Sequence, residues 1–422
     1  MVTTERLARH LRTPDAVVVG LGAMIGAGVF AAFAPAARAA GGLLLVALGI
    51  AAVVAYCNAT SSARLAALYP QSGGTYVYGR ERLGGFWGYL AGWGFVVGKT
   101  ASCAAMALTV GAYAFPGHER AVAVLAVAAV TALNLFGVQK SALATRVIVA
   151  VVLVVLAAVV AACLLGRPAA PGTAASGGGW GVLQGAGLLF FAFAGYARIA
   201  TLGEEVAEPA RTIPRAIRIS LGITLVVYLA VAVAALAALG PGRLAASTAP
   251  LADAVTAAGS AWLTPAVRAG AAIAALGSLL ALVLGVSRTT LAMARDRHLP
   301  RFLAAVHPAR QIPHRAEIAV GVVVILLVTF LDLRGAIGFS SFGVLVYYAV
   351  ANASAWTLRP DEGAPPRLVP ALGLAGCLLL AATLPFASVL AGLAVFAIGA
   401  LLWLARRAAR PTPPGSPTPP SA

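Results

Sequence analysis

The stretch "VVVGLGAMIGAGVF", from Val17 to Phe30, carries four glycines in an otherwise almost entirely apolar segment. These glycines are Gly20, Gly22, Gly26 and Gly28. Glycine costs about 1 kcal/mol relative to alanine inside a helix, so an ordinary apolar helix gains nothing from them. The segment therefore predicts a special use of its backbone, and the composition of the whole chain limits what that use can be.

The chain is too apolar for a soluble protein. Of its 422 residues, 61% are hydrophobic and only 10% are charged, whereas a soluble domain averages about 25% charged residues. Lipid is the alternative solvent, and a hydrocarbon core roughly 30 Å thick needs about 20 apolar residues per helix. We therefore expect an all-α membrane protein that lies in the lipid bilayer and crosses it many times.

Twelve apolar segments are long enough to be read as membrane-spanning helices. No cleavable signal peptide is expected, because the first apolar run is too long for one. The final residues, "PTPPGSPTPPSA", are rich in proline and are expected to be disordered. The twelve predicted spans lie near residues 15–38, 42–68, 84–113, 121–137, 142–166, 182–203, 214–239, 265–292, 316–333, 335–357, 368–386 and 388–405.

The basic residues predict the orientation of the chain. With the N-terminus inside, most of the 30 Lys and Arg residues fall in the inner connections and tails, as the positive-inside rule requires. The protein is therefore expected to lie in the inner membrane of a cell, with both termini in the cytoplasm. The net charge of +17 is then explained by topology and by contact with anionic lipids. No basic stripe with interleaved aromatic residues occurs, so a nucleic-acid partner is not expected.

The cysteines and histidines do not predict a metal site. All four cysteines, Cys57, Cys103, Cys163 and Cys377, fall inside predicted spans and are best read as small buried hydrophobic residues. The five histidines lie in connections or tails, and no two of them sit at metal-ligand spacing near a carboxylate inside a span. A zinc site is therefore not expected. Paired catalytic carboxylates inside spans are missing as well, which argues against a membrane-embedded enzyme.

Three interpretations compete for the glycines of the first span. A dinucleotide-binding fingerprint would need glycine at position 25, which is Ile25, and a strand before it. Close helix packing is the simplest alternative, because Gly22 and Gly26 form a G-x-x-x-G pattern. The third interpretation is a helix that breaks inside the membrane, where the freed backbone groups line a cavity and form the substrate site of a transporter.

A second interrupted span favours the broken-helix interpretation. The sixth span contains "LLFFAFAGYARIATLGEE", Leu188 to Glu205, with Gly195 near its middle among several aromatic residues. Five spans separate the starts of the two interrupted helices, which is typical of two five-helix units in inverted orientation. Spans 1–5 and 6–10 would form these units, with two additional helices at the end. A structural membrane subunit would have no need of two matched broken helices.

Four further motifs carry a resemblance to a known family. "GAMIGAGVF" (Gly22 to Phe30) resembles the first-helix signature of the amino acid–polyamine–organocation (APC) permeases. Three other stretches are similar to segments of the same permeases: "YPQSGGTYVYGRERLGGFWGYLAGW" (Tyr69 to Trp93), "EEVAEPARTIPRAI" (Glu204 to Ile217) and "MARDRHLPRFL" (Met293 to Leu303). The resemblance covers residues 14–310 well and is specific for the family, but much less so for the substrate.

The resemblance implies a leucine-transporter-like 5+5 inverted repeat with broken helices 1 and 6. Residues 1–13 would form a cytoplasmic N-terminal segment, 14–358 the transport core of helices 1–10, 359–408 helices 11 and 12, and 409–422 the Pro-rich tail. The broken helices would hold an amino acid by backbone groups. The N–H groups at a half-helix N-terminus, around Ile25 to Gly28, would favour a carboxylate, and freed carbonyls, near Ala23, Met24, Phe190 and Phe191, would accept from the ammonium. The expected substrate-binding residues are Ala23, Met24, Ile25, Gly26, Ala27, Gly28, Phe190, Phe191, Phe193, Ala194 and Gly195.

Two residues in the predicted spans carry additional hypotheses. Phe191 falls where the family places an aromatic gate, although an ordinary core phenylalanine is the alternative. Lys99 lies about halfway through the third span, where a charge is costly and marks a functional site by default. Because burial disfavours the charged form of an amine, Lys99 is a proton-coupling candidate. It could instead pair with a substrate carboxylate or extend toward the interface.

Charged residues after the second break form a candidate gate. Arg198 could meet Glu204 or Glu205 at a cytoplasmic gate, face the substrate, or form a local ion pair without a role in transport. Sodium coupling is not favoured, because the eighth span offers only the Ser278 hydroxyl beside the first helix. Some proton-coupled relatives carry a lysine in helix five, and the corresponding segment of this chain has none.

The sequence therefore predicts a secondary active transporter of amino acids, with proton-coupled uptake by alternating access. An amino acid or amine exchanger is the alternative function. No enzyme activity, organic cofactor or metal is expected, and the coupling ion is expected to be a proton. The sequence names neither the amino acid nor the oligomeric state.

Overall fold

The computed structural model describes residues 11–70, 73–137, 142–166, 177–200, 206–308 and 310–408. Every named element in these ranges is a helix, and the one β contact in them is a parallel bridge between Leu11 and Val206. The all-helical prediction is therefore confirmed for this part of the chain. The Pro-rich tail and most of the N-terminal segment lie outside the described residues.

Seventeen α-helices and five short 3-10 helices follow one another along the described residues. The α-helices are α1 (Thr13–Met24), α2 (Ala27–Ala31), α3 (Phe33–Ala40), α4 (Leu44–Leu68), α5 (Thr75–Leu83), α6 (Gly85–Ala114), α7 (Glu119–Leu135), α8 (Ala142–Leu165), α9 (Gly178–Phe193), α10 (Ala197–Ala200), α11 (Pro209–Ala246), α12 (Pro250–Ala257), α13 (Thr264–Arg295), α14 (His314–Phe330), α15 (Leu333–Trp356), α16 (Leu368–Thr383) and α17 (Phe386–Ala408). The 3-10 helices are η1 (Gly41–Leu43), η2 (Ala194–Tyr196), η3 (Ala261–Leu263), η4 (Arg301–Ala304) and η5 (Pro360–Glu362).

Helices cover all twelve segments that the sequence analysis predicts to span the membrane. In the described residues, nine helical stretches are long and apolar enough to cross a membrane. The other three predicted spans correspond to α7, α14 and α16, which have 17, 17 and 16 residues. At 1.5 Å per residue these helices reach only about 24–26 Å, so the chain is a multi-pass membrane protein while twelve crossings stay a prediction.

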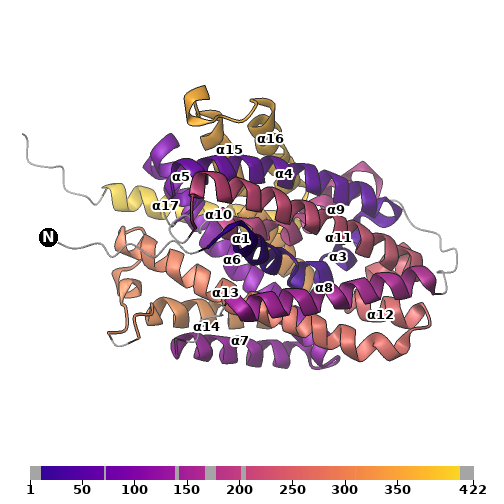
Figure 1. The fold of residues 1–422 in the computed structure, drawn as a ribbon. Coiled ribbons are helices and arrows are strands. Elements are labelled where there is room, and N and C mark those ends of the chain that lie inside the picture. Colours follow the sequence, from indigo (N-terminus) through magenta and orange to yellow (C-terminus); the bar gives the residue numbers. More distant parts are fainter. Residues whose placement is uncertain are drawn as a thin grey trace, which may run out of the picture.

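The helices are arranged with a buried centre and an apolar rim. In the most apolar stretches of α6 and α15, 83% of the residues are buried, and in that of Gly178–Ala200 the share is 78%. The corresponding figure falls to 28% for α8 and 17% for α17. Figure 1 shows α1 and α6 in the middle of the bundle, with α4 and α9 on one side and α13, α14 and α7 on the other.

The rim carries large apolar side chains that point away from the protein. Leu165, Trp262, Phe330 and Phe386 are between 78% and 87% exposed. Exposed apolar surface on this scale is typical of a membrane interface rather than of a soluble monomer. The four cysteines are buried and unpaired, as the sequence predicts.

A kink divides α11 near its C-terminal end. Gly240 has a φ of +68° inside the helix, and Pro241 follows it. Glycine tolerates this left-handed conformation, and proline supplies no N–H for a helical hydrogen bond. The kink lies one residue beyond the predicted end of the seventh span, so sequence and structure agree on where the straight segment stops.

Candidate functional site

The first helix is interrupted at Ile25 and Gly26. α1 ends at Met24 and α2 begins at Ala27, with φ/ψ of −84°/48° at Ile25 and −105°/−132° at Gly26. The Ile25 N–H still donates to the Leu21 carbonyl, 2.7 Å away. The expectation that amide groups become available from Ile25 onward is therefore one residue too early, and those of the second half-helix follow Gly26.

The glycines of this segment allow close contacts with other helices. A Cβ atom at Gly26 would overlap the Ser278 Oγ of α13, and one at Gly28 would lie 2.7 Å from the Ala192 Cα of α9. Both glycines have ordinary negative φ values, since neither is among the residues with positive φ. Helix packing and helix breaking therefore operate together here, and the close contacts leave no space for a larger side chain at either position.

Side chains from two other helices hold the carbonyls at the end of α1. The Tyr228 hydroxyl of α11 donates to the Met24 carbonyl at 2.6 Å. The Ser278 hydroxyl donates to the Gly22 carbonyl at 3.4 Å. Both side chains are buried, with Tyr228 fully covered and Ser278 6% exposed. Because carbonyls at a helix end lack intrahelical partners, these hydroxyls stabilise the interrupted backbone.

The sixth predicted span is tightened rather than fully unwound. α9 ends at Phe193, the 3-10 helix η2 follows, and α10 begins at Ala197. The sequence analysis places freed carbonyls near Phe190 and Phe191, but the Phe190 carbonyl accepts the Ala194 N–H. That part of the prediction is therefore wrong for Phe190. The carbonyls that accept from other helices lie further along, at Ala192 and Ala194.

The two irregular segments meet in space. A Cβ atom at Gly195 would overlap the Ala23 backbone and lie 2.7 Å from the Met24 nitrogen. The Tyr228 hydroxyl lies within hydrogen-bond distance of both segments, 2.6 Å from the Met24 carbonyl and 3.0 Å from the Ala192 carbonyl. Residues about 170 positions apart in the sequence therefore share one backbone-lined site, where Gly22, Ala23 and Gly195 are the partly accessible members.

Lys99 reaches this site from α6. Its Nζ donates to the Ala194 carbonyl at 3.2 Å, and its side chain is 7% exposed. The Tyr348 hydroxyl of α15 donates to the same carbonyl at 3.4 Å. No described carboxylate forms an ion pair with Lys99. The lysine is therefore joined to the second irregular segment through its backbone.

The aromatic residues of α9 surround the second segment. Phe190 packs edge-on against Tyr348, with ring centroids 5.8 Å apart, and Phe193 packs edge-on against Tyr228 at 5.1 Å. Phe191, the gate candidate, is 8% exposed, and Ala27 and Ala194 are buried. The apolar residues predicted to bind the substrate therefore lie next to the two backbone breaks.

The candidate gate beyond the second segment is described only in part. Arg198 lies in α10 and is half-buried, whereas Glu204 and Glu205 lie outside the described residues. Their ion pair with Arg198 therefore stays a prediction. The segment that follows is anchored, because the Ala207 N–H donates to the Leu11 carbonyl at 2.9 Å. This bond connects the "EEVAEPARTIPRAI" motif to the start of α1.

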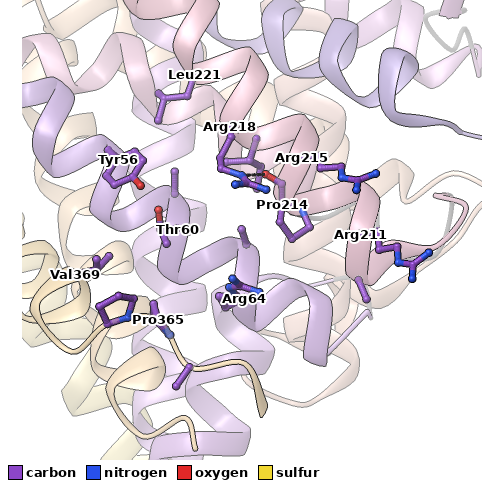
Figure 2. Close-up of a pocket in the computed structure, with 16 residues that line it drawn as sticks. Tyr56, Thr60, Arg64, Arg211, Pro214, Arg215, Arg218, Leu221, Pro365 and Val369 are labelled. Atoms are coloured by element: carbon purple, nitrogen blue, oxygen red, sulfur yellow. Dashed lines mark hydrogen bonds between the residues drawn. The ribbon is translucent and has the colours of Figure 1, made fainter. Parts of the chain in front are cut away.

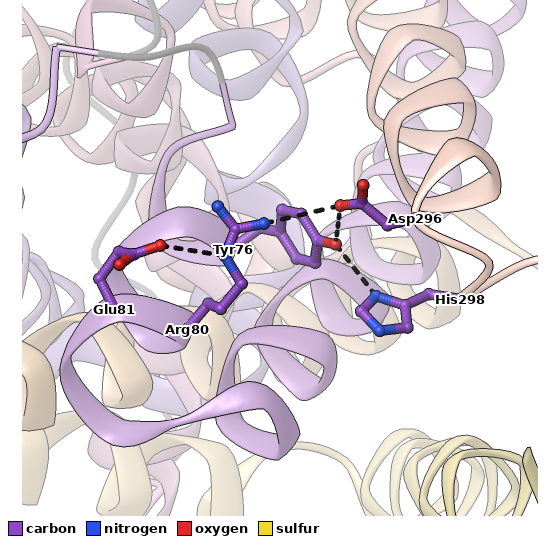
Figure 3. Close-up of polar contacts among 5 residues, drawn as sticks. All are labelled: Tyr76, Arg80, Glu81, Asp296 and His298. Atoms are coloured by element: carbon purple, nitrogen blue, oxygen red, sulfur yellow. Dashed lines mark hydrogen bonds and ion pairs between the residues drawn. The ribbon is translucent and has the colours of Figure 1, made fainter. Parts of the chain in front are cut away.

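Two other motifs, far apart in the sequence, form a polar cluster (Figure 3). The Tyr76 hydroxyl of α5 donates to the Asp296 carboxylate and lies 3.0 Å from the His298 Nδ1. Arg80 lies 3.7 Å from Asp296 and 3.1 Å from Glu81. Burial and the neighbouring Asp296 carboxylate raise the pKa of Tyr76, so its phenol stays protonated and keeps donating. The cluster fixes α5 to the segment after α13.

Three buried residues at or near these helices were missed by sequence reasoning. Tyr228 and Tyr348 lie inside predicted spans, where a tyrosine needs a partner for its hydroxyl. Glu317 is 1% exposed in α14 and accepts from the Asn134 Nδ2 at 2.5 Å. A carboxyl within a predicted span was the available signal. In the described residues, no group of three His, Cys, Asp or Glu side chains is placed to hold a metal ion.

A multi-pass helical bundle with two irregular helices that meet at its buried centre defines a membrane transporter. The amino acid permease family matches residues 11–413, so this chain belongs to that family, within the APC superfamily. It is accordingly a transporter and not an enzyme.

The relatives agree with this classification. A protein of Mycobacterium tuberculosis described as an uncharacterized transporter is 66% identical over 406 residues, which cover 96% of this chain and 92% of that protein. The vacuolar cationic amino acid transporter 4 of Arabidopsis thaliana is 30% identical over 392 residues, covering 86% and 65%. The human cationic amino acid transporter 4 is 30% identical over 396 residues, covering 85% and 61%.

Proposed function

We propose that this permease is a secondary active transporter that takes up amino acids together with protons by alternating access. The proposal includes twelve membrane crossings, a 5+5 inverted repeat formed by helices 1–10, an inner-membrane location and cytoplasmic termini. The observation that carries it is the contact between the two irregular segments, where Gly195 lies against the backbone of Ala23 and Met24. Alternating access requires a substrate site between two helices that can move relative to each other.

Backbone groups would recognise the common part of the amino acid. The substrate carboxylate would lie at the amide groups after Gly26, where α2 begins and the helix end favours an anion. The ammonium group would lie at carbonyls of the two irregular segments, with the partly accessible Ala23 nearest to Gly195. The side chain would then face Phe191, Phe193 and the small residues Ala27 and Ala194. Phe191 would close the outer path over a bound substrate.

The charges at the site favour a substrate without a cationic side chain. The Arabidopsis and human relatives are named as cationic amino acid transporters, and a cationic side chain needs a carboxylate partner when it leaves water. Lys99 already places a positive charge at the second irregular segment. A second cation beside it would be repelled. We therefore infer a neutral amino acid as the preferred substrate.

Lys99 would couple proton movement to the shape of the second segment. A protonated ammonium on the Ala194 carbonyl is a charge-assisted hydrogen bond, which is roughly twice as strong as a neutral one. Loss of the proton would weaken this bond and leave the Tyr348 hydroxyl as the stronger donor. Ser278 is the one hydroxyl between Ala274 and Gly285 of the eighth predicted span, so a sodium ion there would lack a ligand. A proton is therefore the coupling ion in this proposal.

The test compares two variants in proteoliposomes. Lys99→Met keeps the length of the side chain and removes its charge, whereas Thr109→Val removes a buried hydroxyl that bonds only within the same helix, to the Ala105 carbonyl. We expect Lys99→Met to keep counterflow exchange of a neutral amino acid but to lose accumulation driven by a pH gradient. Thr109→Val should keep both activities.

The remaining outcomes separate the alternatives. If Lys99→Met still concentrates substrate under a proton gradient alone, Lys99 is not the coupling group. If the wild-type protein exchanges substrate but never accumulates it, the protein is an exchanger of amino acids or amines. Replacement of sodium by potassium should leave uptake unchanged, and a requirement for sodium would contradict proton coupling. Phe191→Ala should weaken binding and permit leak, whereas an unchanged protein would make Phe191 a core residue only.

A further inference from the structure

A pocket lies between α4 and α11, away from the helix breaks. Its volume is about 420 Å³, and Ala364, Pro365 and Pro366 close one side of it before α16 begins. Figure 2 shows the guanidinium groups of Arg64 and Arg218 in the space between the two helices. The pocket shares none of the residues assigned to the substrate site, so it has a separate role.

The pocket is strongly basic and its charges are only partly satisfied. Four arginines line it, namely Arg64, Arg211, Arg215 and Arg218, and none of the lining residues is acidic. Arg211 lies 3.5 Å from Glu208, and the Arg218 Nε donates to the Pro214 carbonyl. Within the described part of the chain, Arg64 and Arg215 form no hydrogen bond or ion pair. Such a concentration of positive charge fits an anion.

Both helices change from basic to apolar in the same direction. Along α4, Arg64, Thr60 and Tyr56 follow one another at intervals of four residues, so they lie on one helix face. Along α11, the arginines give way to Leu221, and Arg211 and Leu221 are about 15 Å apart along the helix axis. The pocket therefore has a charged end and an apolar end.

The apolar end opens onto the outer surface of the bundle. Tyr56 is 51% exposed, and the neighbouring Val53 and Ile219 are 57% and 47% exposed. A soluble anion would use the arginines but leave this apolar wall without a partner. A phospholipid would use both parts, because its phosphate and its acyl chains are joined in the same molecule.

We propose that this pocket is a binding site for an anionic phospholipid. The phosphate lies between Arg64 and Arg218, and an acyl chain follows Tyr56, Ile217 and Leu221 toward the exposed surface. Basic pockets between membrane helices bind such headgroups. The bound lipid connects α4, α11 and the segment before α16. Because α11 also carries Tyr228, the lipid acts on a helix that contacts both irregular segments. Binding itself does not depend on the proposed substrate or coupling ion.

The experiment uses the purified full-length protein and two double variants. Arg64→Gln/Arg218→Gln removes two charges from the pocket. Arg295→Gln/Arg315→Gln removes two charges from exposed positions of α13 and α14 outside it. Each protein is mixed with phosphatidylglycerol or phosphatidylcholine, and retained lipid is measured by native mass spectrometry. We expect the preference for phosphatidylglycerol to fall roughly tenfold in the pocket variant, since each basic residue near a lipid surface contributes measurably to binding, and to persist in the control.

The other outcomes overturn the proposal. Equal loss in the control variant means that lipid is attracted by total charge and not by this pocket. Protection of the wild-type protein against thermal unfolding by inorganic phosphate, as strong as by phosphatidylglycerol, means that the site binds a soluble anion. If the glutamine variant does not fold, Arg215→Gln replaces it, because that side chain is exposed and makes no described contact. Unchanged lipid preference in a folded pocket variant also contradicts the proposal.

Discussion

The two irregular segments both have backbone carbonyls that accept hydrogen bonds from other helices, but the donor groups differ. The break between α1 and α2 leaves two residues outside any helix, and neutral hydroxyls from Tyr228 and Ser278 hold its carbonyls. The segment after α9 keeps a 3-10 turn, and a lysine ammonium and a tyrosine hydroxyl share the Ala194 carbonyl. One break is therefore held by neutral hydroxyls alone, and the other by an ammonium together with a hydroxyl.

This difference suggests a division of labour within the transporter. Under the proposed function, the first segment would provide a constant backbone surface for the part that all amino acids share. The second would change the strength of its hydrogen bond when Lys99 gains or loses a proton. Variants that affect one segment without the other are therefore the most informative.

The largest effect is expected from Gly195→Ala. The added Cβ would overlap the backbone of Ala23 and approach the Met24 nitrogen, and a backbone cannot move aside as a side chain can. Overpacking costs about 1–3 kcal/mol in stability, and we expect uptake to fall at least about 100-fold. Uptake in proteoliposomes and thermal unfolding measure the two effects. Gly222→Ala is the matched control, because a Cβ at Gly222 has no neighbour within 4 Å. Normal uptake in Gly195→Ala would contradict the close contact.

A smaller and reversible effect is expected from Gly26→Ala. Here the added Cβ would first meet the Ser278 side chain, and the next nearest atom, the Gly22 carbonyl oxygen, lies 3.6 Å away. Uptake should fall, and Gly26→Ala/Ser278→Gly should recover a substantial part of it because the second change removes the obstacle. Binding affinity and uptake of the single and double variants decide the matter. Absence of any recovery would mean that Gly26 is needed for the substrate itself.

Tyr228→Phe should have an intermediate effect, larger than that of Tyr348→Phe. Tyr228 serves a carbonyl in each segment, whereas Tyr348 serves only Ala194, where Lys99 also donates. Leaving a buried carbonyl without a donor costs about 1–3 kcal/mol, so we expect about tenfold lower uptake for Tyr228→Phe. Side-by-side transport assays test the order. The reverse order would show that the second segment depends more on hydroxyl donors than on Lys99.

The smallest effect is expected far from both segments, at the ion pair of Arg82 and Glu362. The hydrogen bond from Arg82 lowers the pKa of Glu362. A lowered carboxyl pKa means that the pair stabilises the folded state above the ordinary carboxyl pKa, and that this contribution disappears as the pH falls through the lowered value. Glu362→Gln should therefore lower the melting temperature slightly at neutral pH and not at all in acid, with uptake unchanged. Asp361→Asn is the control, and a change in uptake would connect this pair to transport.

The sequence predicted the first break because four glycines fall within nine positions of an apolar segment. Gly26 lies at the interruption itself. The sequence could not show which glycine is needed for packing and which for the break, because that depends on neighbours such as Ser278 and Ala192 from distant helices. Gly195, near the middle of the second predicted interruption, lies in η2, whereas the freed carbonyls were placed about one turn too early, because Phe190 and Phe191 belong to a regular helix.

Contacts between distant segments could not be predicted from the sequence either, because they also depend on how the helices pack. Tyr76 and Asp296 each stand in a recognisable motif, but nothing in either motif says that they meet. Lys99 was identified from the cost of a charge in mid-span, whereas its acceptor, the Ala194 carbonyl, is a backbone group that carries no signature. A single buried polar residue can be found from the sequence, but its hydrogen-bond partner can be identified only from the folded structure.

The position of the Tyr228 hydroxyl has a further consequence for movement. A phenol carries one hydrogen, yet two carbonyl oxygens lie within 3.0 Å of this oxygen. The hydrogen can turn from one acceptor to the other by rotation about the C–O bond. If the two segments move relative to each other during transport, the same hydroxyl would have an acceptor in either of them, and α11 would stay bonded to one.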